Sequence, residues 1–215
     1  ERINFSVPTG NFGDIYAGYV AKKMGLPINK LIIATNKNDI LKRVIETGCY
    51  KPSEVKHTIS PSMDIQVASN FERLIFDIVA CDSKKTLKLM NDLNESGEFK
   101  LAKEELQKIR DSFLSESLSE EMTKSVISEM YKNYGALVDP HTAVGIGVTK
   151  KISPEENTVI LSTAHPSKFP DVVMEATSIK PELPENLKSI LVKKEKYDRL
   201  PKDFEKVKKY IRERK

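Results

Sequence analysis

Residues 3–35, INFSVPTGNFGDIYAGYVAKKMGLPINKLIIAT, predict two β-strands with a helix between them. The first strand, Ile3–Val7, is a short β-prone run. A helix is expected over Asp14–Met24, because its apolar residues recur at helical spacing and Gly25 follows where a glycine cap belongs. The second strand, Leu31–Thr35, is continuously apolar, as is typical of strands buried on both faces of a parallel sheet. This alternation with short links indicates an α/β fold with right-handed crossovers.

The remainder of the chain predicts mainly helices. One helix begins after Asn38 or Asp39 and ends near Gly48. The middle section, at about residues 70–134, is expected to be helical, and a further strand is expected at Thr158–Leu161. We therefore expect an open, mostly parallel sheet with flanking helices. The expected helices after residue 70 are Asn70–Val79, Lys84–Asn94, Leu101–Arg110, a helix from Ser119 to Gly135 and one that opens at Asp139-Pro140.

The composition is that of a globular protein. The chain has 215 residues, of which 39% are hydrophobic and 31% charged, which excludes collagen, low-complexity disorder and a disulfide scaffold. No apolar run approaches the roughly 18–20 residues that cross a bilayer, so no membrane span is expected. The two cysteines, Cys49 and Cys81, do not make a disulfide framework or a zinc cluster. Because no charged-then-apolar leader follows Glu1, we expect a cytoplasmic protein with free thiols.

The net charge of +4 comes from the C-terminal segment. Residues 187–215 hold 12 Lys and Arg against 5 Asp and Glu, a local charge of +7, and the other 186 residues hold 23 against 26, or −3. Acidic residues are interleaved with the basic ones, and Phe204, Val207, Tyr210 and Ile211 form one apolar stripe at helical spacing. We therefore expect a separate basic segment whose amphipathic helix packs on the body, and no nucleic-acid partner.

The strongest local signal is Gly10-Asn11-Phe12-Gly13-Asp14, which lies between the first strand and its helix. Glycines permit a tight turn and a close approach to a ligand, and the N–H groups at a helix start favour an anion. Such a loop lies at the carboxyl end of its strand, where α/β sheets bind ligands. Because the P-loop and dinucleotide-binding patterns are both absent, a phosphate-binding loop and a plain structural turn stay open. Asp14 is expected to match the helix dipole as a cap rather than to act as an acid catalyst.

A second segment with the same layout, STAHPSKF at residues 162–169, follows the predicted strand Thr158–Leu161. Small hydroxyl residues just past a strand end can face a ligand, although a strand-to-helix turn with a capping hydroxyl is the simpler interpretation. The histidines, His57, His141 and His165, lack the spacing of a metal site, and no G-x-S-x-G elbow exists. We therefore expect no metal site and a structural role for each histidine.

Five blocks of the sequence share their order and spacing with one enzyme family. The blocks are VPTGNFGD at 7–14, ATNKND at 34–39, SPSMDI at 60–65 with SNFER at 69–73, DPHTAVG at 139–145 and STAHPSKF at 162–169. Together they resemble threonine synthase. The resemblance extends from Val7 to about Phe169, nearly the whole chain, with a looser match beyond. Each short block is weak by itself, but the shared order and spacing of five argue against chance.

The resemblance implies a pyridoxal-phosphate enzyme of the tryptophan-synthase-β fold type, fold type II, that converts O-phospho-L-homoserine and water to L-threonine and phosphate. Residues 1–186 would then be the C-terminal portion of the large cofactor-binding domain, followed by the basic segment 187–215. By the resemblance, Gly10 to Asp14 match the loop around the cofactor phosphate, and Thr163 matches the residue whose hydroxyl faces the pyridine nitrogen. The family blocks also hold four residues without assigned roles in the vicinity of the active site, namely Asn36, Ser62, Asp64 and His141.

The resemblance also implies that a catalytic element is missing from this sequence. The family carries its Schiff-base lysine upstream of the glycine loop, in a Ser-Phe-Lys-Asp-like motif that this sequence does not contain. Lys168 lies in the wrong block for that role. We therefore expect the C-terminal portion of a threonine synthase, incomplete at the N-terminus and inactive alone, with the N-terminal portion supplied by the same gene or by a partner chain. The alternatives are a non-catalytic phosphate-ligand-binding or interaction module and a plain structural α/β domain.

Overall fold

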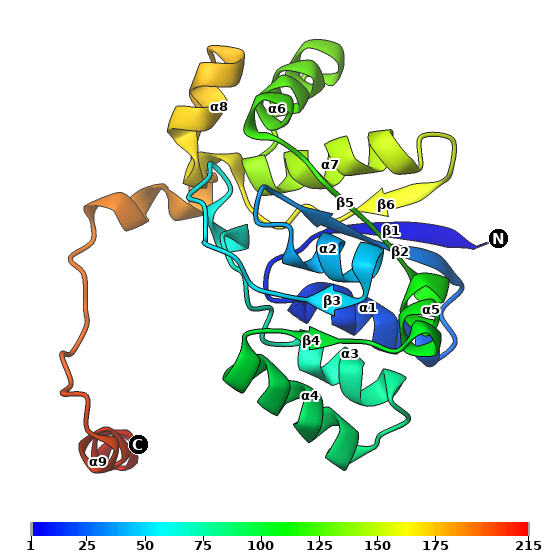
Figure 1. Cartoon of the computed structure of the whole chain (residues 1–215). Helices are drawn as coiled ribbons and strands as arrows, with labels where there is room; N and C mark the ends of the chain where they lie inside the picture. Colours follow the sequence, from blue (N-terminus) through cyan, green and yellow to red (C-terminus); the bar gives the residue numbers. More distant parts are fainter. Residues whose placement is uncertain (1, 215) are drawn as a thin grey trace. The chain divides into compact units, whose positions relative to one another are not determined.

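Four parallel strands form the sheet of the computed structural model, which describes residues 2–214 (Figure 1). Their spatial order is β5 (Phe113–Ser117), β2 (Ile28–Thr35), β1 (Ile3–Pro8) and β6 (Thr158–Ile160). β1 pairs with β2 and β6, and β2 pairs with β5, all in parallel. The predicted α/β fold with a mostly parallel sheet is confirmed.

The crossover from β1 to β2 runs through α1 (Gly13–Lys23), which starts directly after the glycine loop. Ile15 and Tyr19 are the buried residues of this helix. Gly25 follows its end with a φ of 107°, a conformation that favours glycine. Pro8 at the end of β1 pairs with Ala34 of β2, so the glycine loop lies at the carboxyl edge of the sheet.

Helices account for most of the remaining chain, as predicted. Ser119 and Asp139 each cap a helix by accepting N–H groups of its first turn. Within residues 2–214, no helix is long and apolar enough to cross a membrane. The helices are α2 (Ile40–Thr47), α3 (Phe71–Ile78), α4 (Ser83–Ser96), α5 (Lys103–Ser112), α6 (Glu120–Tyr134), α7 (Pro140–Ile152) and α8 (Pro170–Thr177), with 3-10 turns η1 (Pro61–Met63) and η2 (Pro166–Lys168).

β2 separates two hydrophobic clusters, one on each face of the sheet. Leu31 and Ile33 belong to the first cluster, whereas Ile32 and Ala34 belong to the second, because successive side chains of a strand point to opposite faces. All four are fully buried. In Figure 1, α6 and α7 lie on one side of the sheet, and α1 and α2 lie on the other. The uninterrupted apolar run of β2 is the sequence counterpart of this double burial.

One strand was missing from the sequence-based expectation, in the section expected to be helical. Phe113–Ser117 forms β5 and pairs in register with Leu31–Thr35 of β2. Its last four residues are only half-buried, because β5 lies at an edge of the sheet. The segment therefore shows neither a long apolar run nor a clear alternation. A short antiparallel pair, β3 (Cys49–Tyr50) and β4 (Phe99–Lys100), was not expected either.

The chain divides into two compact units after Pro181. The second unit contains a 3-10 segment, η3 (Glu185–Val192), and the helix α9 (Phe204–Glu213). Asp203 caps α9 by accepting the Lys206 N–H at 3.0 Å. The predicted C-terminal helix is therefore present. Its packing on the body and the expected domain boundary after residue 186 stay predictions.

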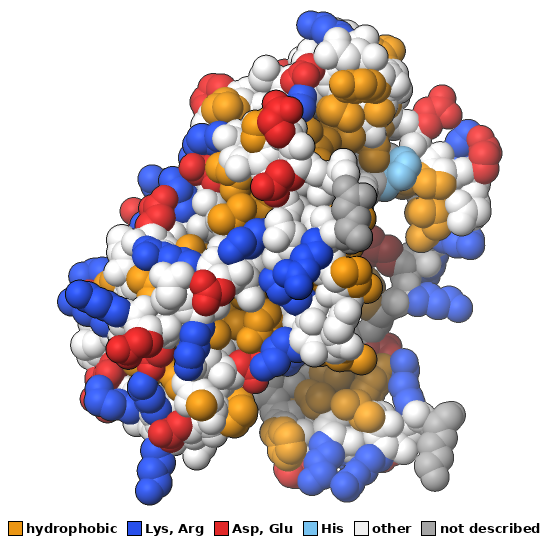
Figure 2. All heavy atoms as spheres, turned by 90° about the vertical axis from the view of Figure 1, so that its right-hand side faces the viewer, with side chains coloured by type: hydrophobic (Ala, Val, Ile, Leu, Met, Phe, Trp, Pro, Cys, Tyr) orange, Lys and Arg blue, Asp and Glu red, His pale blue; other side chains and the backbone are white. Residues whose placement is uncertain are grey.

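Charged side chains of both signs are interspersed over the face shown in Figure 2, with separate hydrophobic groups between them. Several surface charges of the protein are paired: Lys150 Nζ lies 2.5 Å from Glu129 Oε1, and Lys124 Nζ lies 2.6 Å from Glu175 Oε1. Exposed pairs of this kind each contribute only about 0–1 kcal/mol to stability. The fold therefore depends mainly on the two hydrophobic clusters.

Candidate functional site

A cavity of about 150 Å³ opens where β1 and β6 end. We call it the Gly10 pocket. Its walls come from four separate parts of the chain: the β1–α1 loop, the η1 turn, the start of α7 and the segment after β6. The lining residues are Pro8, Gly10, Asp14, Ser62, Met63, His141, Thr163, Ala164 and Lys168.

The β1–α1 loop presents unpaired backbone N–H groups beside this pocket. Phe12 precedes α1 in the left-handed conformation, with φ 67° and ψ 9°, and no side chain caps the helix. Within residues 2–214, no hydrogen bond engages the N–H groups from Gly10 to Asp14. Free N–H groups at a helix start, together with the helix dipole, make a site for an anion. The loop is therefore suited to hold a phosphate group.

Phe12 anchors the loop in the hydrophobic core. Its side chain is only 1% exposed, and its ring contacts Phe71 edge-on, with centroids 5.1 Å apart, and Phe113 at 5.7 Å. A left-handed backbone costs roughly 1–2 kcal/mol at a residue with a Cβ. Burial of the aromatic ring offsets that cost. The Phe12 side chain therefore holds the loop and does not line the pocket.

Gly10 lies against the η1 turn. A Cβ at this position would be 2.6 Å from the carbonyl oxygen of Ser62, so the close approach of the two backbones requires glycine. Asn70 holds the neighbouring residue, because both its N–H and its Nδ2 donate to the Asn11 carbonyl oxygen at 3.0 Å. The loop is thus fixed by surrounding chain segments and does not need a ligand to define its shape.

His141 connects the start of α7 to the η1 turn. Its Nε2 accepts the Ser62 N–H at 3.2 Å, and its Nδ1 lies 2.9 Å from Oδ1 of Asp139. Because Nε2 is an acceptor, the network assigns the proton to Nδ1, which donates to the carboxylate. His141 is buried, and its ring centroid lies 4.8 Å from that of Phe169. This arrangement suits a histidine that positions the Ser62 backbone beside Gly10.

Asp139 is a fully buried carboxylate that sequence reasoning treated only as a helix cap. It accepts the His141 N–H at 2.9 Å, the Thr142 hydroxyl and the His141 ring Nδ1–H. Burial alone would raise the pKa of Asp139, but the hydrogen bonds from His141 and Thr142 outweigh it and hold the pKa below its usual value. The ionised carboxylate therefore fixes the tautomer and orientation of His141.

Three further side chains offer polar groups to the pocket, namely Ser62, Thr163 and Lys168. Within residues 2–214, none of the three makes a side-chain hydrogen bond or ion pair; Lys168 Nζ lies 6.0 Å from the Phe169 ring centroid. The sequence motif assigns no Schiff-base role to Lys168. Its position in the same block as Thr163 was the available signal, and the structure places it among the lining residues.

Asn36 and Asp64 do not line the Gly10 pocket but belong to a separate polar network. Asn36 Nδ2 donates to Asp64 Oδ1 and to Thr58 Oγ1, both at 2.8 Å, and Asn36 Oδ1 accepts the Asn38 N–H at 2.8 Å. Asp64 also accepts the Thr58 N–H at 2.8 Å and the Thr58 hydroxyl at 2.6 Å. With Ser60, these residues form what we call the Asn36–Asp64 cluster, which ties the loop before η1 to the end of β2.

The structure thus brings half of the ten predicted site residues to one cavity: Gly10, Asp14, Ser62, His141 and Thr163. The other five residues do not line this cavity: Phe12 lies in the core, Asn36 and Asp64 lie in the Asn36–Asp64 cluster, and Asn11 and Gly13 lie along the loop. Within residues 2–214, no group of three His, Cys, Asp or Glu side chains is arranged to hold a metal ion. The pocket therefore combines backbone N–H groups, hydroxyls and one lysine, which is the donor set of an anion site.

Comparison with known protein families gives a consistent match. The family described as "Threonine synthase, C-terminal" matches residues 142–211. A threonine synthase from Pseudomonas aeruginosa is 41% identical over 98% of this chain, and the alignment covers 46% of that protein. The threonine synthase of Saccharomyces cerevisiae is 41% identical over 99% of this chain and 47% of its own length. The chain therefore spans about half the length of the curated relatives that it matches.

Solved structures agree with the sequence matches. The structure titled as PLP-bound threonine synthase from Brucella melitensis superimposes with a TM-score of 0.91 at 44% identity, over 99% of this chain and 46% of that one. The yeast threonine synthase gives a TM-score of 0.86 at 38% identity, over 99% of this chain and 47% of that one. The similarity therefore holds for both sequence and fold.

Proposed function

Since this chain belongs to the threonine synthase family, whose members it matches over their C-terminal portion, we propose that it supplies the phosphate-binding side of a pyridoxal-phosphate lyase site. The observation that carries the proposal is the Gly10 pocket. Its unpaired N–H groups from Gly10 to Asp14 lie next to the unpaired side chains of Ser62, Thr163 and Lys168. A phosphate dianion needs several such donors, and a nearby cation strengthens their effect.

The residues present fit pyridoxal phosphate. The N–H groups of the β1–α1 loop would hold its phosphate, and the Lys168 ammonium, which lines the same cavity, would add positive charge. The Asp14 carboxylate is compatible with this arrangement because it lies at the helix start, where the dipole favours negative charge. When bound, this cofactor supplies an electron sink for carbanion chemistry, and the protein tunes its strength.

Thr163 is the residue that we assign to the pyridine nitrogen. Its exposed hydroxyl lines the cavity and makes no hydrogen bond with residues 2–214. A neutral hydroxyl cannot hold a proton on the ring nitrogen as a carboxylate would. The weaker electron withdrawal that results favours elimination of phosphate and addition of water over transamination.

The proposed substrate of the complete enzyme is O-phospho-L-homoserine, which with water gives L-threonine and phosphate in cytoplasmic amino-acid biosynthesis. The Schiff-base lysine would come from the N-terminal portion, on the same polypeptide or on a partner chain. In this scheme His141 does not exchange protons with the substrate. It holds the η1 turn by accepting the Ser62 N–H at Nε2, and Asp139 orients the ring through Nδ1.

A turnover assay tests the assignment. This chain is mixed with pyridoxal phosphate and O-phospho-L-homoserine, and phosphate release is followed with and without the N-terminal portion of a family member as a second chain. We expect no turnover from the 215-residue chain alone, because the lysine is absent, and phosphate release when both portions are present. Appreciable turnover by this chain alone would contradict the proposal.

A further inference from the structure

A second hollow lies between α3, α4 and the segment that leads into α3, and it shares no lining residue with the Gly10 pocket. We call it the aromatic pocket. Its volume is about 220 Å³, room for roughly seven water molecules at liquid density. That is below the roughly 300–1,000 Å³ of sites for drug-sized ligands. The pocket is therefore sized for a molecule no larger than an amino acid.

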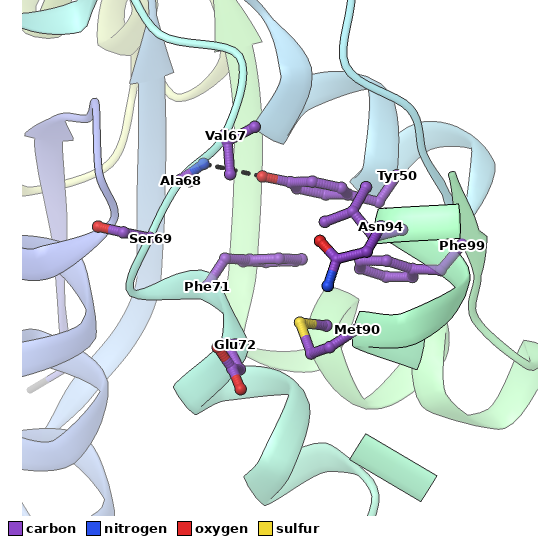
Figure 3. A pocket seen from close by; sticks show the side chains of 10 residues that line it. Tyr50, Val67, Ala68, Ser69, Phe71, Glu72, Met90, Asn94 and Phe99 are labelled. Carbon is purple, nitrogen blue, oxygen red and sulfur yellow. Dashed lines mark hydrogen bonds between the residues drawn. The ribbon is translucent and has the colours of Figure 1, made fainter. Parts of the chain in front are cut away.

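Three stacked rings form one wall of the aromatic pocket (Figure 3). Phe99 stacks on Tyr50 with centroids 4.9 Å apart and planes at 5°, and Tyr50 stacks on Phe71 at 5.5 Å and 13°. The Tyr50 hydroxyl accepts the Ala68 N–H at 2.8 Å, which fixes this ring from its far end. Met90 lies alongside, as Figure 3 shows, and its flexible thioether can adjust to a ligand. The pocket is thus lined by rigid aromatic rings and by one flexible side chain, that of Met90.

The rim of the aromatic pocket carries polar groups without partners. Within residues 2–214, the side chains of Ser69, Glu72 and Asn94 make no hydrogen bond or ion pair. A wider hollow adjoins the pocket, shares Ser69 and Glu72 with it, and is also lined by Arg73. The Arg73 guanidinium likewise makes no ion pair in the described part of the chain. Glu72 therefore borders the apolar slot, and Arg73, the next residue at the start of α3, borders the hollow that adjoins it.

We propose that the aromatic pocket binds an α-amino acid with an apolar side chain. The side chain enters the slot against Phe71, Tyr50 and Phe99, while the ammonium group pairs with Glu72 and the carboxylate with Arg73. The opposite charges of Glu72, on the slot, and of Arg73, on the adjoining hollow, match the two charges of a zwitterion that lies where the two hollows meet. A purely apolar molecule would use neither charge, and a nucleotide would exceed the volume of the slot.

Calorimetric titration of the 215-residue chain with L-leucine tests the proposal, with L-alanine, 4-methylpentanoate and isoamylamine as comparison ligands. The two analogues keep an apolar chain but lack the ammonium or the carboxylate. L-Leucine is expected to bind saturably and at least about tenfold more tightly than L-alanine, because its extra methyl and methylene groups are buried. Each analogue is expected to bind about three- to tenfold more weakly than L-leucine, because one charge pairing is lost.

Two single variants test the charge pairings, and a third serves as the matched control. Glu72→Gln and Arg73→Gln are expected to weaken L-leucine binding about three- to tenfold without affecting folding, since both residues are exposed. Glu104→Gln changes another exposed glutamate in the first turn of a helix, outside the pocket, and is expected to bind like the wild type. The proposal is overturned if L-leucine shows no saturable binding to the wild-type chain at about 10 mM. It is also overturned if both analogues bind the wild-type chain as tightly as L-leucine does, or if Glu72→Gln and Arg73→Gln both bind L-leucine as tightly as the wild type does.

Discussion

The Gly10 pocket and the Asn36–Asp64 cluster both include residues of the η1 turn or next to it, yet their main polar groups differ in hydrogen bonding. In the pocket, the N–H groups from Gly10 to Asp14 and the hydroxyl of Thr163 make no hydrogen bond within residues 2–214. In the cluster, both side-chain oxygens of Asp64 accept hydrogen bonds. Unpaired donors around a cavity are available to a ligand, whereas paired groups hold the chain in place.

This difference separates two kinds of residue that occur in the same family blocks. Asn36 and Asp64 secure the loop that leads into η1, and the turn then presents Ser62 to the pocket. Gly10 and Thr163 form the surface that the loop helps to enclose. We therefore expect changes in the cluster to lower stability and changes in the pocket to lower ligand affinity.

The largest expected effect is that of Asp64→Ala. The substitution removes the sole acceptor that the Thr58 N–H has in the described chain, and one acceptor each of the Asn36 amide, the Asn38 amide and the Thr58 hydroxyl. The free energy of unfolding should therefore fall by about 2–4 kcal/mol in a urea titration. Asp92→Ala is the matched control, because it removes only the exposed pair with Lys88 and should cost less than about 1 kcal/mol. An Asp64 variant as stable as the wild type would contradict a structural role for the cluster.

Gly10→Ala should have a smaller effect on stability and a larger one on binding. The added Cβ would lie 2.6 Å from the Ser62 carbonyl oxygen, which must move away at a cost of about 1–3 kcal/mol. That movement displaces the loop whose N–H groups form the anion site. Gly97→Ala is the control: its φ of 77° makes alanine cost about 1–2 kcal/mol, but it lies outside the pocket and should leave binding intact.

Asp139→Asn tests the charge that orients His141. The pKa of Asp139 lies below its ordinary value of 3.8, so the ionised carboxylate stabilises the fold above that pH, and this contribution disappears as the pH falls through the lowered pKa. The variant should lose about 1–3 kcal/mol at neutral pH. The difference from the wild type should shrink as urea titrations are repeated at increasingly acidic pH. A difference that stays constant down to the lowest pH at which both proteins fold would be evidence against the ionised carboxylate.

Thr163→Val should produce the smallest change in stability, within about 0.5 kcal/mol, because the residue is exposed and its hydroxyl has no partner in the described chain. The affinity for pyridoxine 5′-phosphate should nevertheless fall about three- to tenfold, since the ring nitrogen loses its hydrogen bond. Inorganic phosphate, titrated in the same way, should bind equally to both proteins. If phosphate binding also fell, Thr163 would belong to the phosphate side of the pocket.

The sequence predicted best what local pattern alone determines. β1, α1 and β2 follow from apolar spacing and from the position of Gly25, and the loop between them is recognisable because it joins a strand to a helix. β5 escaped prediction because pairing with β2, and not its own composition, makes it a strand.

The site was only partly predictable, because contacts between side chains cannot be read from a motif. Family blocks identified Gly10, Ser62, His141 and Thr163, but a block cannot tell whether a polar side chain is paired. Asp139 shows the limit: its sequence position indicates a helix cap, whereas its contact with the His141 ring arises only in three dimensions. The same applies to Lys168, which lies at the end of η2 and lines the same cavity as Thr163.

Titration of pyridoxine 5′-phosphate against the wild-type chain, Gly10→Ala and Gly97→Ala tests the phosphate-binding role of the Gly10 pocket most directly. This ligand carries the cofactor's phosphate and ring but no aldehyde, so it cannot form an adventitious Schiff base with a surface lysine. We predict saturable binding to the wild type and to Gly97→Ala, at least about tenfold weaker binding to Gly10→Ala, and none of unphosphorylated pyridoxine. Equal binding to the wild type and Gly10→Ala, or equal binding of pyridoxine with and without its phosphate, would contradict the assignment.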